Sequence, residues 1–269
     1  MKRRISERRR TWANLLDLLK DVVTFDNSKR ILDIGCGPTS IFLSLRKGEK
    51  YALDPTLKSL FDICPFLRGI EEYKDVNFIS SPIEDVTIDK QFDLIFMINV
   101  LDHVGELKPV IDKIDELLAP FGILVLLVDC YADPVVRNII KFFDVDLPHP
   151  HHFVAEEVIG LFPSHRLIKY GNRAFEIFPD CVSREQGGDI PIYRVDRFIA
   201  QKVQELSELG KKGDPLFALK SFLSSGLCYF VTPLRRRERP LVGLKKRRLF
   251  VFQKPERDSA FQCPQWRRG

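Results

Sequence analysis

Between residues 29 and 129 the chain alternates short, continuously apolar segments with segments whose apolar residues recur at helical spacing. The apolar segments are 29–35, 50–54, 76–80, 91–101 and 122–129. Strands without polar alternation are buried on both faces, and strands separated by helices pair in parallel. This pattern predicts an α/β fold, namely a doubly wound, mostly parallel sheet with helices on both faces.

The rest of the chain is organised around this core. An amphipathic helix is expected within 1–27, before the core at 28–179. Two helix-like segments fill most of 180–245, which we interpret as a cap inserted on the substrate side. An alternating strand and a basic tail follow at 246–269. Seven strands are expected in the sheet, and a helix is expected over 39–48.

Composition limits the class of protein. The 269 residues are 45% hydrophobic, enough for one large domain or a domain with an appendage. No apolar run reaches the roughly 20 residues of a membrane span, and the N-terminus lacks the core of a removable signal. The six cysteines form no CxxC pair, which favours reduced thiols in a cytoplasmic protein.

The net charge of +5 is concentrated at the two ends of the chain. Six of the first ten residues are basic, and residues 235–269 hold twelve basic and three acidic residues. Solvated termini are one interpretation, and a partner with phosphates or anionic headgroups is the other. The apolar stretch 216–237 ends in an arginine cluster, which suits either peripheral contact with a membrane surface or a cap helix packed on the core.

Candidate site residues follow the predicted strands, and in such a sheet ligands bind beyond the carboxyl ends of the strands. Gly35 and Gly37 follow the first strand, where a Cβ would block a ligand that approaches the backbone. Asp54 follows the second strand and can accept both hydrogens of a ribose diol. Asn99 and His103 follow the fourth. Structural alternatives are a tight turn for the glycines, a helix start for Asp54, a strand-end cap for Asn99 and packing for His103.

The glycine turn alone does not identify the ligand. Asp33, directly ahead of the glycines, would crowd a pyrophosphate but suits a cofactor with an amino group. Ser40 stands where a dinucleotide-binding turn has its third glycine. Thr39 is expected either to cap the next helix or to narrow the approach to the cofactor. Asp33 and Ser40 favour a cofactor with an amino group over a dinucleotide such as NAD.

The segments ILDIGCGPTSI, YALDP, FISSPIEDV, FDLIFMINVLDHV and ELLAPFGILVLLV together resemble the class I S-adenosylmethionine-dependent methyltransferases. The resemblance covers roughly residues 28–170 and implies a Rossmann-like core and the branch acting on small molecules, lipids or glycans. The cofactor residues that it implies are Asp33, Gly35, Cys36, Gly37, Asp54, Pro55, Ile83, Glu84 and Asn99. Asp33 would hold the amino group through water, Asp54 the ribose, and Ile83 and Glu84 the adenine. Thr39 and Pro82 depart from the family's usual glycine and aspartate.

The methyl acceptor is a small molecule, lipid or glycan in the leading hypothesis. His103 is the candidate general base, with Asp129 and the histidines at 149–152 as others. That histidine cluster lacks an obvious acidic or thiol partner, so no metal is expected. The basic segments make a nucleic-acid methyltransferase the alternative, and a cofactor-binding scaffold without turnover is a third hypothesis. The sequence does not specify the oligomeric state.

Overall fold

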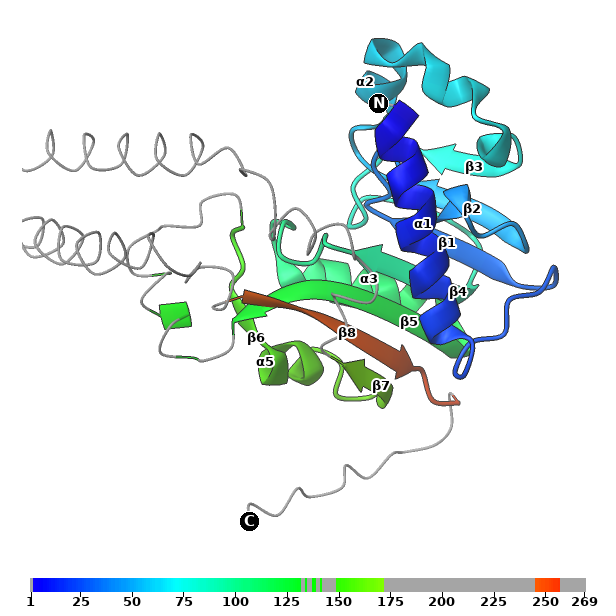
Figure 1. Ribbon diagram of the computed structural model, residues 1–269. Coiled ribbons are helices and arrows are strands. Elements are labelled where there is room, and N and C mark those ends of the chain that lie inside the picture. Colours follow the sequence, from blue (N-terminus) through cyan, green and yellow to red (C-terminus); the bar gives the residue numbers. More distant parts are fainter. Residues whose placement is uncertain are drawn as a thin grey trace, which may run out of the picture.

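The computed structural model describes residues 2–131, the isolated positions 134, 137, 138 and 141, and residues 149–171 and 245–256. The expected cap and the basic tail after residue 256 lie outside these residues. Figure 1 shows the described elements. The helices are α1 (Lys2–Leu19), α2 (Leu57–Ile63), α3 (Leu107–Leu117) and α5 (Ala155–Gly160), with 3-10 turns η1 (Ile41–Leu43), η2 (Pro65–Gly69) and η3 (Glu71–Tyr73). The strands are β1 (Arg30–Ile34), β2 (Glu49–Leu53), β3 (Val76–Ile79), β4 (Phe92–Ile98), β5 (Leu118–Tyr131), β6 (Phe153–Val154), β7 (Arg166–Gly171) and β8 (Lys245–Gln253). None of these helices is long and apolar enough to cross a membrane.

The strands form one sheet in the order β3-β2-β1-β4-β5-β8-β7. The pairs from β3 to β5 are parallel, and β8 runs antiparallel between β5 and β7. The predicted doubly wound, mostly parallel fold is confirmed, and the closing strand belongs to the main sheet. Among the described residues the sheet has eight strands rather than the expected seven, because the two-residue β6 pairs with the end of β5.

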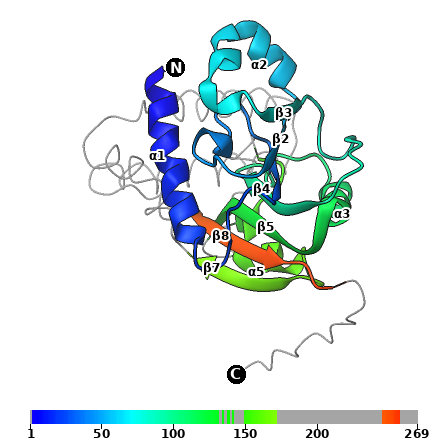
Figure 2. The same cartoon turned by 90° about the vertical axis from the view of Figure 1, so that its right-hand side faces the viewer.

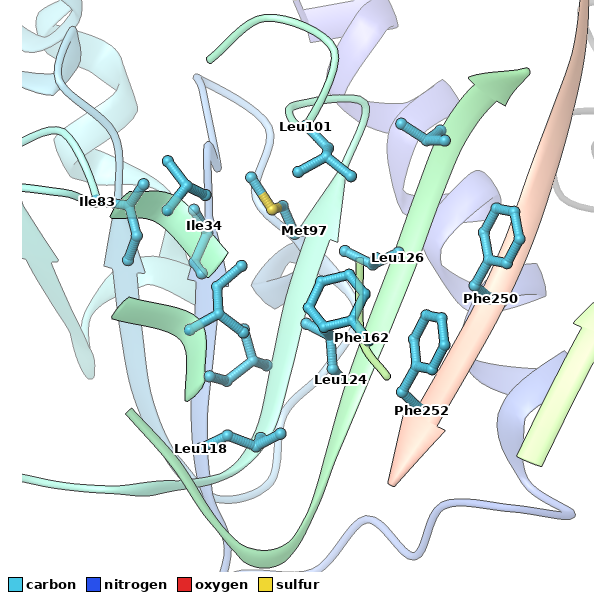
Figure 3. Close-up of a cluster of buried hydrophobic side chains, with 14 of the residues drawn as sticks. Ile34, Ile83, Met97, Leu101, Leu118, Leu124, Leu126, Phe162, Phe250 and Phe252 are labelled. Carbon is cyan, nitrogen blue, oxygen red and sulfur yellow. The ribbon is translucent and has the colours of Figure 1, made fainter. Parts of the chain in front are cut away.

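Two hydrophobic clusters cover opposite faces of the sheet, and neighbouring strand residues alternate between them. Ile31 packs with α1, whereas Leu32 packs with α3 and α5. Figure 2 shows α1 on one side of the sheet and α3 on the other. Figure 3 shows the second cluster, in which Phe250 and Phe252 from β8 stand beside Leu124 and Leu126 of β5. The last strand therefore completes the core, although β7 ends at Gly171 and β8 begins only at Lys245.

The expected helix over 39–48 is wrong, because the segment forms only the 3-10 turn η1. Ile41, Phe42 and Leu43 are all at most 1% exposed, so this segment has no polar face to present to solvent as a surface helix would. Gly48 then turns the chain into β2 with φ of 90°. The connection between β1 and β2 therefore passes through a buried 3-10 turn in place of a helix.

The basic N-terminal helix is fastened to the molecule by its own arginine and tryptophan. The Trp12 Nε1–H donates to the Thr39 carbonyl at 2.8 Å, and the Arg9 guanidinium lies 2.8 Å from the Glu72 carboxylate. Arg46 contacts the same oxygen of Glu72, which is 8% exposed. At least part of the basic charge at the chain's start therefore serves internal packing.

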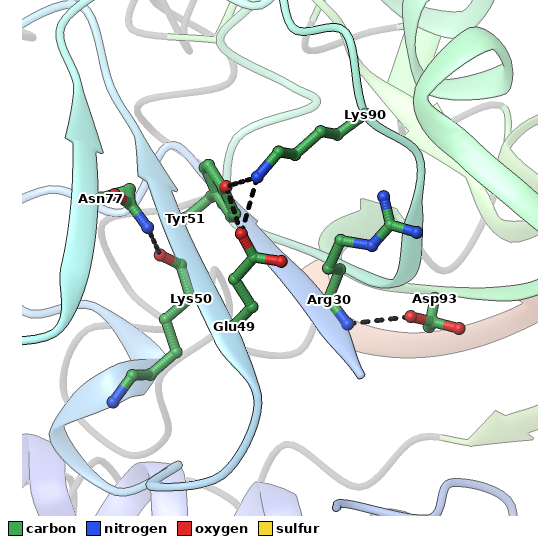
Figure 4. A network of polar contacts seen from close by, with 7 residues as sticks. All are labelled: Arg30, Glu49, Lys50, Tyr51, Asn77, Lys90 and Asp93. Carbon is green, nitrogen blue, oxygen red and sulfur yellow. Dashed lines mark hydrogen bonds and ion pairs between the residues drawn. The ribbon is translucent and has the colours of Figure 1, made fainter. Parts of the chain in front are cut away.

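Polar contacts hold the strands at the edge opposite their carboxyl ends (Figure 4). The Lys90 ammonium donates to the Glu49 carboxylate at 2.7 Å and to the Tyr51 hydroxyl at 2.6 Å. The backbone N–H of Arg30 donates to Asp93 at 2.8 Å. These contacts join the amino-terminal ends of neighbouring strands and stabilise the sheet there.

Candidate functional site

A cleft of about 360 Å³ lies beyond the carboxyl ends of the parallel strands, in the size range of small-molecule sites (about 300–1,000 Å³). It sits where the strand order reverses between β1 and β4, the position at which doubly wound sheets bind ligands. Of the predicted site residues, the wall includes Gly35, Asp54, Pro55, Ile83, Glu84, Asn99 and His103. Asp33, Cys36 and Gly37 are not part of this wall. Four loops far apart in the sequence thus meet in one cleft.

The two glycines of the first loop both have left-handed backbones, with φ of 66° at Gly35 and 51° at Gly37. A Cβ on Gly35 would come within 2.2 Å of a Val100 methyl carbon, whereas a Cβ on Gly37 would meet nothing within 4 Å. Gly35 is therefore required by the packing of the β1 and β4 loops against each other. The expected reason, close approach of a ligand, fits Gly37 better.

Asp33 fixes the shape of the glycine turn. One carboxylate oxygen accepts from the Ser40 hydroxyl at 2.6 Å and from the Ile41 N–H at 3.0 Å. Burial raises the pKa of Asp33 to about 6, although these two hydrogen bonds oppose the rise. Ser40 caps η1 by accepting from the Phe42 N–H, so the expected cap by Thr39 is wrong. Asp33 is therefore almost fully buried, and it acts on the site indirectly by holding the glycine turn in place.

Asp54 connects the loops after β1 and β2. One of its oxygens accepts from the Gly37 N–H at 2.9 Å, and the other accepts from the Thr56 N–H at 2.8 Å and hydroxyl at 2.5 Å. A carboxylate offers about four lone-pair positions, so a further donor can be accommodated. The Thr56 hydroxyl can also rotate away, which frees a second position for a diol.

Asn99 has an unusual conformation for a non-glycine residue, with φ of 55°. Its N–H donates to the Leu127 carbonyl at 2.7 Å, which fixes the backbone at the end of β4. Its Oδ1 is buried and has no hydrogen-bond partner within the described part of the chain. Such an atom is costly to bury, and a donor on a bound ligand would satisfy it.

His103 lies in the turn after β4, on the cleft wall, and its side chain is exposed. Its ring stands 4.5 Å from the ring of His149, measured between centroids. His149 in turn lies 3.7 Å from the Asp102 carboxylate. The sequence indicated His103 and the histidines at 149–152 as separate candidate bases. In the structure His103 and His149 lie together beside Asp102.

Asp129, another predicted base, is held in a different interaction. The Arg247 guanidinium donates to both carboxylate oxygens, at 2.8 and 3.2 Å. Both oxygens of this carboxylate are thus engaged by a guanidinium, and Asp129 does not line the cleft. The structure therefore disfavours Asp129 as the base and explains one basic residue of the C-terminal segment.

Sequence reasoning missed the two hydroxyl side chains that hold the acidic residues, Ser40 and Thr56. A weak signal was present, because a hydroxyl residue follows each of these strand-end turns within a few positions and such residues favour turns and caps. Position alone did not indicate which carboxylate each would contact.

These residues fit S-adenosylmethionine, the cofactor that the sequence suggests. The cleft wall offers the Asp54 carboxylate for a ribose and, within the described residues, a buried acceptor without a partner at Asn99 Oδ1. The N–H of Gly37 already donates to Asp54, so the glycine turn and the acidic residue form one unit.

Comparisons with known proteins agree with this geometry. The profile of a family described as a methyltransferase domain matches residues 4–173. A ubiquinone biosynthesis O-methyltransferase of Rickettsia bellii (strain OSU 85-389) is 29% identical over 97 residues, which are 36% of this chain and 40% of that relative. The match thus spans about two fifths of the relative's length.

Two solved structures share the fold. A putative sarcosine dimethylglycine methyltransferase from Galdieria sulphuraria superposes with a TM-score of 0.60 at 12% identity, over 91% of this chain and 86% of the other. Coclaurine N-methyltransferase bound to N-methylheliamine and SAH superposes with a TM-score of 0.53 at 12% identity, over 90% and 72%. At these identities the likeness concerns the fold.

Proposed function

The chain belongs to the methyltransferase-domain family, and on this premise we propose that it methylates a hydroxyl group of a small molecule with S-adenosylmethionine as donor. The sequence resemblance to class I methyltransferases is thereby confirmed. The observation that carries the proposal is the joining of Asp54 to the Gly37 N–H at the switch point of the sheet. The hydroxyl acceptor is suggested by the O-methyltransferase relatives, which match part of the chain.

When bound, S-adenosylmethionine supplies a methyl group that is already activated by its sulfonium sulfur. Asp54 would hold the ribose hydroxyls, and Asn99 Oδ1 would accept a hydrogen bond from the cofactor's amino group. Ile83 and Glu84, which also line the cleft, would contact the adenine. Asp33 acts indirectly, because its bonds to Ser40 and Ile41 keep the glycine turn in place.

The chain's remaining task is to orient the acceptor and to remove a proton from its hydroxyl. His103 is the group that we assign to this proton, because its exposed ring lies on the wall of the same cleft. The ring of His149, 4.5 Å away, limits the orientations that His103 can adopt. A hydrophobic floor from Ile34, Leu53 and Val100 suits an acceptor with an apolar body.

Calorimetry with S-adenosylmethionine tests the cofactor assignment. We expect Asp54→Ala to weaken binding at least tenfold and Asp54→Asn to weaken it less, because an amide oxygen still accepts hydrogen bonds. Asp85→Ala is the matched control, since this carboxylate is exposed in the neighbouring turn and does not line the cleft. Equal affinity of the wild type and Asp54→Ala would refute the assignment of Asp54.

Transfer of a labelled methyl group into a fractionated cell extract tests the acceptor. We expect label in a small-molecule fraction, and mass spectrometry of the product should place the methyl group on oxygen. Label on nitrogen or in RNA would overturn the hydroxyl proposal. Cofactor binding without any labelled acceptor would favour the scaffold hypothesis.

A further inference from the structure

Three potential metal ligands meet at the rim of the cleft. Asp102 and His103 lie in the turn after β4, and His149 lies in the loop before β6. One ligand atom from each residue falls within 4.8 Å of the others. A tetrahedral ion with bonds of about 2.0–2.2 Å to N and O needs ligand atoms roughly 3.5 Å apart. The His149–Asp102 separation of 3.7 Å is already close to this value.

The Asp102 carboxylate is the strongest indication that a cation binds here. It is 3% exposed, and its Oδ1 has no hydrogen-bond partner within the described residues. Its other oxygen faces His149 at 3.7 Å, which is longer than a hydrogen bond. A buried carboxylate without donors is unfavourable, so a positive charge at this position would lower its free energy.

Two further contacts hold the loop of His149 against the turn of Asp102. The His151 N–H donates to the Asp102 carbonyl at 3.4 Å, and the His151 Nε2 lies 3.1 Å from the Gly105 carbonyl. The three ligands are therefore brought together by the fold rather than by flexible surface side chains. The sequence did not reveal the group, because its acidic member lies far from the histidine loop along the chain.

We propose that Asp102, His103 and His149 form a binding site for a divalent transition-metal ion of the zinc class. Two imidazoles and one carboxylate are a donor set that such ions bind, and three protein ligands leave a coordination position open. His103 also lines the cleft, so the open position is available to a group bound there.

The ion would bind the acceptor's hydroxyl oxygen, and in this respect the inference rests on the proposed function. A bound divalent ion lowers the pKa of a coordinated O–H group. The O–H bond breaks with its electron pair staying on oxygen, the proton passes to water, and the ion remains divalent. In the metal-bound protein His103 is a ligand of the ion. In the metal-free protein its ring accepts the proton of the acceptor's hydroxyl group.

The test is a titration of Co²⁺ into the metal-stripped full-length chain, followed by the visible absorption of the bound ion. We expect saturation at one ion per chain, with binding weakened at least tenfold in Asp102→Asn and in His149→Gln. His165→Gln is the matched control, because His165 also lies near a carboxylate, Asp115 at 3.5 Å, but neither residue lines the cleft. This variant should bind Co²⁺ like the wild type.

Lack of saturable Co²⁺ binding would overturn the proposal, as would equal binding by the wild type and Asp102→Asn. Asp102 and His149 would then form a histidine–carboxylate pair without a metal ion. Calorimetry with S-adenosylhomocysteine on the same samples keeps the two proposals separate. Retained cofactor binding in His149→Gln shows that the variant is folded. Co²⁺ binding without cofactor binding would refute the proposed function and leave the metal site standing.

Discussion

The substitution Gly35→Ala tests whether the first glycine is required by the protein's own packing. Gly35 has a φ of 66°, and an added Cβ would lie 2.2 Å from Val100 Cγ2. A left-handed backbone costs a residue with a Cβ about 1–2 kcal/mol, and overpacking costs about 1–3 kcal/mol more. We therefore expect Gly35→Ala to lower the free energy of unfolding by about 2–5 kcal/mol.

Gly37→Ala is the matched control for backbone strain. Its φ of 51° is similar, but an added Cβ would meet nothing within 4 Å. We expect it to lower the free energy of unfolding by about 1–2 kcal/mol. The added Cβ would enter the open space of the turn, where the cofactor is proposed to approach. We therefore expect the loss of binding free energy for S-adenosylmethionine to exceed the loss of unfolding free energy.

Urea denaturation followed by circular dichroism measures both changes. In the double variant Gly35→Ala/Val100→Ala the two closest contacts, at 2.2 and 2.9 Å, are removed and only the Val100 Cβ remains, at 3.1 Å. A favourable coupling of about 1–3 kcal/mol is therefore expected between the two sites. Equal destabilisation by Gly35→Ala and Gly37→Ala, together with no coupling to Val100, would refute the reasoning. The glycines would then serve the backbone conformation alone.

Three more predictions concern stability. Asp33 has a raised pKa of about 6, so its unfolded form ionises from about pH 4 while the folded form keeps its proton, and stability is lost as the pH rises from about 4 to 6. In urea titrations the free energy of unfolding of Asp33→Asn should rise relative to that of the wild type by up to about 3 kcal/mol between pH 4 and 7. A difference that does not change with pH would contradict this burial effect. Trp12→Phe removes the hydrogen bond to the Thr39 carbonyl and should cost about 1–2 kcal/mol by thermal unfolding, and no change would show that α1 is held by other contacts. Arg247→Met should cost less than about 1 kcal/mol by the same measurement, because its pair with Asp129 is about one quarter exposed; a loss several times larger would mean that this pair supports the β5–β8 contact.

The sequence alone determined the class of fold and the positions of the candidate site. Continuous apolar strands separated by helices can be buried only in a sheet covered on both faces, and parallel strands end at one edge. Gly35, Asp54, Asn99 and His103 each follow a strand, so they were expected at that edge and line one cleft there. Local pattern suffices here because these residues depend on their distance from a strand end.

Other features depended on contacts between distant segments, and no local pattern reports these. Burial of Ile41, Phe42 and Leu43 against α1 replaced the expected helix with a 3-10 turn. The placement of β8 between β5 and β7 followed from its two antiparallel partners. In each case the competing influence was tertiary burial, which overrides local helical propensity.

The roles of the charged residues also required the tertiary structure. The sequence could name Asp33, Asp54 and Asp129 but could not show that Ser40, Gly37 and Arg247 would be their respective partners. The grouping of Asp102 with His103 and His149 arises because the loop before β6 packs on the turn after β4. The sequence thus determined where a ligand can bind, since that follows from strand ends. Only the tertiary structure decided which side chains meet there, because the free energy of a buried charge depends on what folding places beside it.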